Sequence, residues 1–467
     1  MRTVRIRMRQ GLLLLTLLAS ACGVRAQEPT ETAPPKPAAR AIPLIGDVGN
    51  PQDQETGGTW QPDTTPLTGL QSPTLGRVES PHSYIQPGAQ YGANVQSRPG
   101  STGGSSDWYL NNYFGVSLSL LKDWSRSQLA LNYSAGGFVS TDSQTDNGWY
   151  QQMGAGQNFQ FERWQVQWSD QFSYLPETSF GFGGGTGLGL PGVGGPLGPP
   201  TGGTGGSTTP NQSIYTAAGP RYSNSLVLQT TYLLTRRSSL TASGSIGLLR
   251  FTQAGNVDSN NYTGSLGYNY ALNRQDTLGV VYRFSSFHYD SQPQAIGDQI
   301  ISVAYGRKIT QKLALQLLGG PEITSYRIAI GGNTQRISGS MTANLSAGFK
   351  NGGLSLNYFH GLGGGSGILV GSDTDQITFG ASRRISRIWS AHANVGFSRN
   401  RPVGNVTGST SYNDWYAGGG VDRPIGRNLD FSAAYTARIE TPTNQATSTQ
   451  HVVTLFISWH SRPFVLP

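Results

Sequence analysis

The 467-residue chain has one cysteine and few charged side chains, which make up 12% of the sequence. Cys22 has no partner for an intrachain disulfide, so no disulfide framework supports the fold. Hydrophobic residues are also scarce, at 36%, and low charge combined with low hydrophobicity is unusual for a soluble enzyme. Aromatic residues nevertheless reach 10%, which argues against a disordered chain, because disordered chains are poor in them.

Long apolar runs are missing too, apart from one near the N-terminus. No later stretch reaches the roughly 18 apolar residues that predict a membrane helix. The single run, Leu12–Ala21, follows a segment with four arginines and precedes small residues. This order predicts a secretory signal peptide over residues 1–26, cleaved after Ala26. An alternative is a lipoprotein signal, since Ala19–Cys22 loosely resembles a lipobox with Cys22 as the lipid-bearing residue.

The basic balance of the chain belongs largely to this signal. Cleavage after Ala26 would remove five arginines and no acid, which lowers the formal net charge from +8 to +3. Nucleic-acid binding depends on basic side chains that neutralise phosphates. We therefore expect no nucleic-acid partner.

Residues 27–80 are rich in Pro, Gly, Thr and acidic residues and show no period, which predicts a disordered periplasmic tail. From residue 81 to the end, apolar residues alternate with small polar ones. In residues 114–120, for example, Phe, Val and Leu alternate with Gly and Ser. Period-two alternation is typical of strands whose two faces meet different surroundings.

About eighteen strands are predicted, with sixteen as an alternative, and most reach the roughly 9–11 residues that a tilted strand needs to cross a bilayer. Pro87 and Pro321 predict bulges or early strand ends, because proline cannot donate to the ladder. The predicted ranges are 82–96, 108–121, 126–139, 149–161, 164–174, 222–235, 238–251, 260–272, 276–289, 298–309, 312–328, 335–349, 352–361, 374–385, 388–399, 412–424, 427–440 and 450–460.

The links between these strands alternate in length. After the first, every second link is short, and the others are mostly longer, up to the Gly-rich loop at 175–221. Outer-membrane barrels have short periplasmic turns and long extracellular loops. A large sandwich would need denser packing than Gly, Ser, Gln and Asn supply, and a propeller would show fixed repeats. We therefore predict an all-β fold over 81–467: a transmembrane antiparallel up-and-down β-barrel.

Aromatic side chains recur near the predicted strand ends, as expected for girdles at the two membrane interfaces. The short links carry many arginines and lysines, which favours an anionic lipid surface. Outer-membrane lipid and lipopolysaccharide are the expected surroundings. The girdle candidates are Trp108, Tyr109, Trp149, Tyr150, Trp164, Tyr174, Tyr222, Phe251, Tyr289, Trp389, Trp415 and Tyr416.

The segment GPRYSNSLVLQTTYLLTRRSSLTASGSIGLLRF resembles a recurring block of uncharacterised Gram-negative outer-membrane β-barrels. SYNDWYAGGGVDRPIGRNLDFSAAY and HVVTLFISWHSRP resemble their final strands. The resemblance covers residues 81 to the end. Some such proteins are labelled porins linked to exopolysaccharide export, which implies transport and a polysaccharide export system as a partner. Typical barrels end on an aromatic residue that the barrel assembly machinery reads. Trp459 would serve here, although HSRPFVLP follows.

Motifs for chemistry are weak. Gly187–Gly192 matches G-x-G-x-x-G without the required helix, and Ser119–Lys122 matches S-x-x-K across a strand end, so both are chance matches. Asp373 and Asp375 would suit a cation in a loop, although a solvated acidic loop is favoured. His392, beside Ser390 and Asn394 on the polar face, is more typical of a wet lumen than of a hydrolase. We predict no catalytic, cofactor-binding or metal-binding residue and no cofactor.

The predicted function is a porin-like outer-membrane channel for passage or export of small polar solutes or glycans, with no enzymatic activity. A barrel this wide encloses an aqueous channel unless something plugs it. The inner face is expected to be neutral, with sparse charges such as Arg283 and Asp430. Two alternatives stay open: a plugged anchoring barrel with residues 27–80 as plug or tether, and a barrel hydrolase using His392. The 175–221 loop would narrow the pore or stand outward.

Overall fold

A computed structural model gives the arrangement of the chain from Ser83 onward. The described residues all belong to one compact unit, Ile42–Pro467. The predicted signal, the predicted tail and nearly all of the Gly-rich loop lie outside them. No helix in this part of the chain is long and apolar enough to cross a membrane. The structure describes residues 83–97, 108–141, 147–175, 220–252, 256–273, 275–290, 295–310, 312–328, 332–349, 351–363, 370–403, 410–443 and 446–466.

Nineteen strands in these ranges form one antiparallel sheet, so the predicted all-β barrel is confirmed and the predicted counts of 18 and 16 are wrong. Eighteen are long, and each of their boundaries lies within three residues of the predicted one. The strands are β1 (Tyr84–Ser97), β2 (Trp108–Asp123), β3 (Ser127–Ser140), β4 (Gly148–Gln160), β5 (Trp164–Leu175), β6 (Arg221–Leu233), β7 (Ser238–Phe251), β8 (Ser259–Ala271), β9 (Asp276–Tyr289), β10 (Ala295–Lys308), β11 (Leu313–Ile328), β12 (Gly332–Phe349), β13 (Gly352–Gly363), β14 (Ser372–Arg384), β15 (Ser390–Pro402), β16 (Tyr412–Pro424), β17 (Leu429–Pro442), β18 (Ser448–His460) and β19 (Phe464–Val465).

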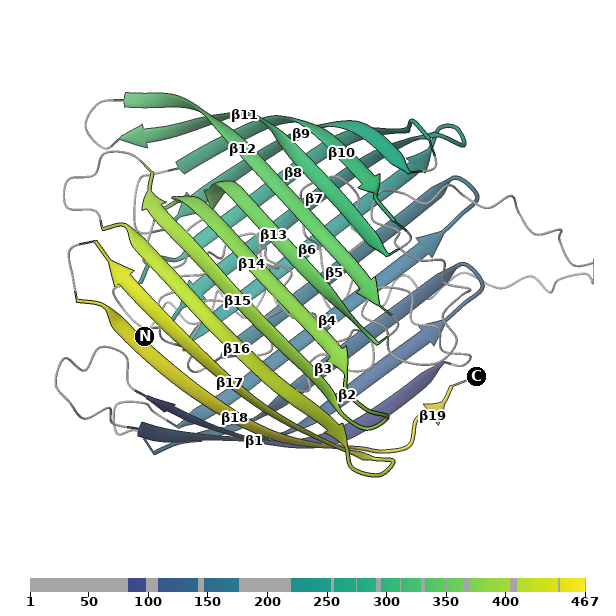
Figure 1. The fold of residues 1–467 in the computed structure, drawn as a ribbon, viewed down its shortest axis with the longest axis vertical. Helices are drawn as coiled ribbons and strands as arrows, with labels where there is room; N and C mark the ends of the chain where they lie inside the picture. Colours follow the sequence, from purple (N-terminus) through teal and green to yellow (C-terminus); the bar gives the residue numbers. More distant parts are fainter. Residues whose placement is uncertain are drawn as a thin grey trace, which may run out of the picture. The chain divides into compact units, whose positions relative to one another are not determined.

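The sheet closes on itself. Each long strand pairs with the next in the sequence, and β1 pairs with both β2 and β18, so the ring has no free edge strand. Figure 1 shows the tilted strands β11–β18 in front of the opposite wall. Closure satisfies the backbone groups that an open sheet would leave unpaired at its edges, which is why closed sheets suit an apolar solvent.

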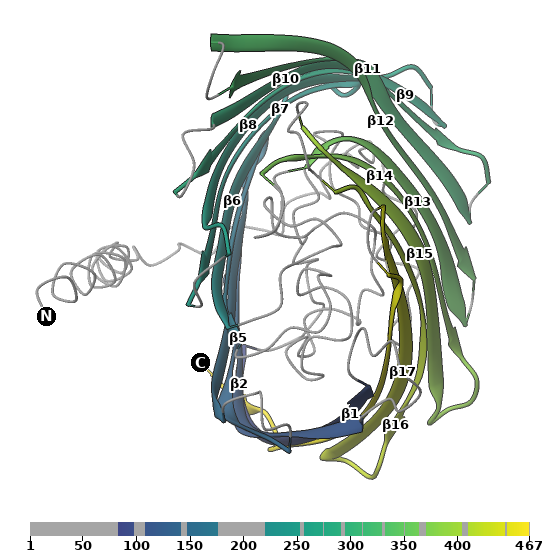
Figure 2. The same ribbon diagram turned by 90° about the vertical axis from the view of Figure 1, so that its left-hand side faces the viewer.

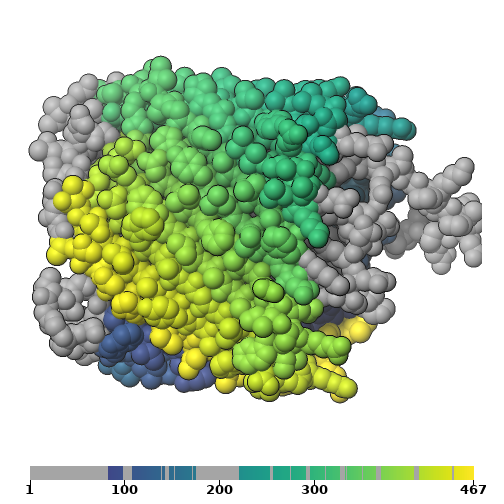
Figure 3. Space-filling model, in the orientation of Figure 1, coloured from purple at the N-terminus to yellow at the C-terminus, as the bar shows by residue number. Residues whose placement is uncertain are grey.

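The alternation of the sequence becomes an alternation of faces. On β7, Leu240, Ile246 and Leu248 are exposed on the outer face, while Thr241 and Ser243 are buried on the inner face. Figure 3 shows the outer face of β12–β18 as a continuous surface of closely packed side chains. Because successive side chains point to opposite faces of a strand, the period-two pattern alone sets which residues face inward.

The wall is irregular between β12 and β13. They pair only over Met341–Phe349, and Gly332–Ser340 of β12 pairs with β11 alone. In Figure 2, the β11–β12 hairpin runs outside the tips of β13 and β14. Side chains replace the missing ladder, because Leu362 N donates to Glu322 Oε1 (3.1 Å) and Ser340 Oγ donates to the carbonyl oxygen of His360 (3.2 Å).

The closing seam contains the strand that the sequence did not predict. Gly88 pairs with His460 of β18, but Ile85 pairs with Phe464 of β19, which shifts the register by one residue. The break lies at Pro87, whose carbonyl faces this seam and accepts from Ser461 N (2.9 Å). Since Pro87 has no N–H to donate on that side, the ladder cannot continue without interruption.

The second proline behaves differently. Pro321 lies inside β11, and the register with β10 is the same on both sides of it, from Ile300–Glu322 to Val303–Gly319. The predicted bulge or strand end at Pro321 is therefore wrong, although the ladder omits the pairs Ile301–Pro321 and Ser302–Gly320. Both prolines interrupt pairing, but only Pro87 marks a change of register.

Candidate functional site

The inner face of the barrel is the candidate site, and it is dominated by small polar side chains. Cross-strand hydrogen bonds join several of them, such as Ser243 Oγ with Ser265 Oγ (2.7 Å). This agrees with the predicted neutral polar lining. Buried members include Ser223, Ser225, Gln229, Thr231, Thr241, Ser243, Ser245, Asn261, Thr263, Ser265, Asn269, Ser302, Ser355, Asn357, Thr378, Ser398, Thr436 and Thr454.

Aromatic residues near the strand ends divide between the two faces. Trp149, Tyr174 and Tyr222 lie in a row on the outer face, with ring centroids 4.4 and 4.5 Å apart and ring planes tilted by 36° and 31°, as expected of a girdle. Tyr150 and Tyr416, predicted for the same girdle, instead face inward and are nearly fully buried. Tyr109 and Tyr289 are also buried on the inner face, so the girdle prediction holds only for part of its members.

Glycines on the neighbouring strands make room for the rings of the inward tyrosines. The Tyr150 hydroxyl contacts Gly115 of β2 and lies where a side chain on Gly136 of β3 would stand. The ring of Tyr416 covers Gly396 of β15 in the same way. Gln90 Nε2 donates to the Tyr150 hydroxyl (2.9 Å), so the buried oxygen is satisfied. Because glycine has no side chain, the ring of a residue on the neighbouring strand can occupy the space above it.

One group of charged residues lies on the inner face of β9–β11. Arg283 Nη2 is 3.6 Å from Asp298 Oδ2, and the Asp298 side chain is 1% exposed. Glu322, equally buried, accepts hydrogen bonds from Ser338 Oγ (3.1 Å) and from the backbone of β13. Farther along β12, Arg336 binds Asp373 of β14 in a bidentate pair at 2.6 and 2.7 Å.

A second group lies on β16 and β17. Arg438 donates from Nε to Asp414 Oδ1 (2.8 Å) and from Nη2 to Asp414 Oδ2 (2.7 Å). Glu440 Oε2 is 3.5 Å from the same guanidinium group. Bidentate pairs of this kind are strong and fixed in direction. The inner face therefore carries more charge than the sequence predicted, but most of it is neutralised in pairs.

A small apolar cluster lies at the long-loop end of the barrel. Phe287 and Ile296 on the inner faces of β9 and β10 pack against Leu362 of β13 and Val403 beyond β15. Gly371, in the left-handed region (φ 70°), lets the chain before β14 approach the Ile296 side chain closely. Two stretches of wall that are not neighbours in the sheet are therefore in contact at this end.

His392 faces inward as predicted. Its only hydrogen-bond partner among the described residues is Asp422, with Nδ1 and Oδ2 3.3 Å apart, and its imidazole covers Gly420. Ser390, two residues away on β15, makes no hydrogen bond to it. The geometry thus provides the acid–imidazole half of a hydrolytic arrangement without a serine nucleophile. His460 and Asp430 form a similar pair on β17 and β18, at 3.3 Å.

Asp373 and Asp375 are not in a loop, so that prediction is wrong. Both belong to β14, and both are paired on its outer face: Asp373 with Arg336, and Asp375 with His360 Nδ1 (2.5 Å) and Arg401 (3.0 Å). No group of three metal-ligating side chains occurs in the described ranges. Ser119 and Lys122 lie on β2, and 187–192 is outside the described residues.

These features define a closed antiparallel β-barrel with a polar inner face and an apolar outer face. No protein-family model matches the chain, and no curated protein matches it. Among solved structures, it is similar to Pseudomonas aeruginosa OccK2 (OpdF) at 8% identity, covering 82% of this chain and 98% of that one (TM-score 0.44). It is also similar to Pseudomonas aeruginosa OpdQ (8%, 82% and 98%, TM-score 0.41) and Acinetobacter baumannii OccAB3 (10%, 81% and 99%, TM-score 0.40).

Proposed function

We propose that the barrel is a passive outer-membrane channel for small polar solutes. The observation that carries this proposal is the division of the wall into two faces, with exposed Leu, Ile, Val, Tyr and Phe outside and neutral polar residues inside. Each long strand has at least 12 residues, enough to cross a bilayer at a tilt. Apolar outward and polar inward is the pattern of water-filled transmembrane barrels.

The paired charges give the channel its expected selectivity. Arg438 cancels the charge of Asp414, and Arg283 that of Asp298, so each group presents only one further carboxylate, Glu440 or Glu322, to a passing ion. A neutral lining of hydroxyls and amides can replace the water around an uncharged solute by hydrogen bonding. We therefore expect weak ion selectivity and passage of uncharged sugars. Glycan export through an exopolysaccharide system is the finer form of this proposal, and it rests on the sequence resemblance.

Conductance of the refolded full-length protein in planar lipid bilayers tests the proposal. Steady steps with weak preference between cations and anions would support it, and swelling of loaded vesicles in sugar solutions would extend it to uncharged solutes. A protein that is folded, as judged by heat-modifiable migration on gels, but electrically silent would overturn the open channel.

Silence would leave the anchoring barrel as the alternative, and one deletion separates the two. Removing residues 27–80 should open a plugged barrel and leave an open one almost unchanged. His392→Ala tests the hydrolase alternative, because it should abolish the activity of a barrel hydrolase and change neither conductance nor solute passage in a channel.

A further inference from the structure

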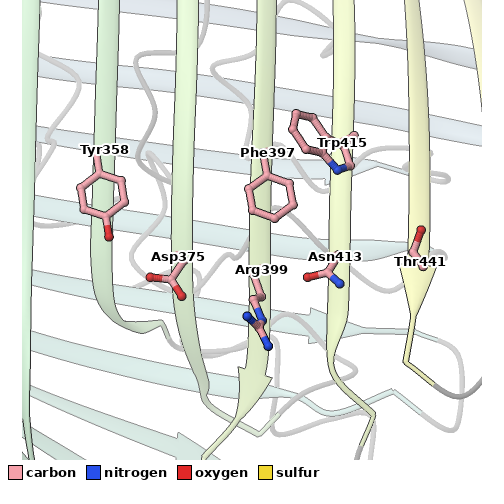
Figure 4. Close-up of a pocket in the computed structure, with 7 residues that line it drawn as sticks. All are labelled: Tyr358, Asp375, Phe397, Arg399, Asn413, Trp415 and Thr441. Atoms are coloured by element: carbon pink, nitrogen blue, oxygen red, sulfur yellow. The ribbon is translucent and has the colours of Figure 1, made fainter.

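The outer face of β13–β17 carries a hollow of about 640 Å³ near the long-loop end. The lining side chains come from the neighbouring strands β13–β17, and Figure 4 shows them side by side in two levels. The lining residues are Tyr358, Asp375, Phe397, Arg399, Asn413, Trp415 and Thr441. The hollow lies outside the barrel, so the proposed channel does not use it.

The two levels are consecutive rows of cross-strand partners. Tyr358, Ile377, Phe397, Trp415 and Ile439 form the first row, which continues the exposed apolar band of the barrel. The rings of Phe397 and Trp415 are in contact, with centroids 4.6 Å apart and planes tilted by 43°, and Trp415 is 51% exposed.

The second row lies one step closer to the long loops and is polar. It consists of His360, Asp375, Arg399, Asn413 and Thr441, again in direct register. Apolar and polar groups therefore change over within two residues along each strand. Such a boundary is where the hydrocarbon of a membrane gives way to head groups.

Of the two oppositely charged residues that line the hollow, Asp375 has ion-pair partners and Arg399 has none among the described residues. Asp375 is held by His360 and Arg401, at 2.5 and 3.0 Å. Arg399 is exposed, and no carboxylate of the described residues lies within ion-pair distance of it. Asn413 and Thr441, beside it in the row, add an amide and a hydroxyl group. The hollow thus offers a free guanidinium group, two neutral hydrogen-bonding groups and an aromatic floor, beside the Asp375 carboxylate, whose charge Arg401 offsets.

We infer that this hollow binds one membrane glycolipid with a phosphorylated sugar head group, such as the lipopolysaccharide of the outer leaflet. Arg399 binds the phosphate, Asn413 and Thr441 bind sugar hydroxyls, and an acyl chain lies along Phe397 and Trp415. Guanidinium groups suit phosphate because they donate in a fork that matches its oxygens. The long loops predict that this end faces the cell exterior, where such a lipid lies.

The inference rests on the proposed outer-membrane placement, but conductance does not enter its test, so the two can fail separately. The refolded full-length protein in detergent micelles would be incubated with deep-rough lipopolysaccharide, or with the same lipid after removal of its phosphates. Retained lipid would be counted by native mass spectrometry. The matched control is Arg423→Gln, because Arg423 is also an exposed outer arginine beside a tryptophan, 5.1 Å from the ring of Trp389, at the opposite rim.

We expect the wild type to retain one phosphorylated lipid per barrel. Arg399→Gln should bind it about tenfold more weakly, because a charged hydrogen bond is lost. Arg423→Gln should bind it as the wild type does. Trp415→Ala should weaken binding of both lipid forms. Equal retention by the wild type and Arg399→Gln would overturn the inference, as would equal retention of the dephosphorylated lipid. Displacement of the lipid by inorganic phosphate alone would show a small-anion site and overturn the lipid assignment. Heat-modifiable migration establishes that each variant is folded.

Discussion

Strands β6–β9 pair along nearly their whole length, whereas β12 and β13 pair over only half of β12. In the first sector, neutral hydroxyl pairs such as Ser243–Ser265 join the inner side chains. In the second, Glu322 and Arg336 span the separation between strands. The difference indicates that a barrel wall can open locally when side chains such as Glu322 and Ser340 satisfy backbone groups that lose their ladder partners, and when an ion pair such as Arg336–Asp373 joins the separated strands.

The largest effect is expected where strands are fully paired, in β16 and β17. A loss of stability there would come from an unpaired charge and not from separated strands. Arg438→Met should leave the buried Asp414 carboxylate uncompensated and lower the free energy of unfolding by roughly 3–5 kcal/mol. Urea unfolding in lipid vesicles, followed by tryptophan fluorescence, measures this. Adding Asp414→Leu should restore much of the loss, and a loss below about 1 kcal/mol would mean that water solvates the pair.

The next effect tests whether the two sectors share the same outer surroundings. Leu228 on β6 and Leu356 on β13 are both exposed near the middle of their strands, by 50% and 38%. Replacing either with Arg should cost roughly 2–4 kcal/mol if it faces the centre of a bilayer. The same unfolding assay applies. Similar costs would mean that the apolar band is continuous, and a negligible cost at either position would place that strand outside the hydrocarbon.

A somewhat smaller loss of stability is expected from a direct comparison of one inner side chain in each sector. Glu322→Ala removes the acceptor for Leu362 N–H and Ser338 Oγ, and should cost roughly 2–3 kcal/mol, because a buried donor loses its partner. Ser243→Ala in the regular sector should cost only about 1 kcal/mol. The ratio of the two losses is the informative quantity. Equal losses would show that the separated edge of β13 finds other partners, and that Glu322 is not what secures it.

The strands could be predicted from the sequence because period two is a local property. Every long strand was placed within three residues of its observed bounds from alternation alone. The inward or outward direction of a side chain follows from the same pattern, which is why His392 and the hydroxyl residues were assigned correctly.

Features that depend on register between strands could not be predicted. The inward rings of Tyr150 and Tyr416 pack over glycines of the neighbouring strand, and that pairing is invisible within one strand, although their inward direction follows from the outward Trp149 and Trp415 before them. Asp373 and Asp375 were assigned to a loop because polar residues at the rim of a strand resemble a loop in composition. Glu322 was missed because its partner, the backbone of Leu362, is 40 residues away.

The seam between the first and last strands has a consequence for how the barrel forms. Gln86 Nε2 donates to the carbonyl oxygen of Ser461 across a sequence separation of 375 residues, so closing this wall requires contacts between distant parts of the chain. Until the C-terminal strands arrive, every intermediate is a curved sheet with two open edges, each able to recruit a strand from another molecule. The risk of aggregation therefore depends on how long these edges stay open, and not on the stability of the finished ring. A factor that covers the edge of β1 until β18 arrives would lower this risk.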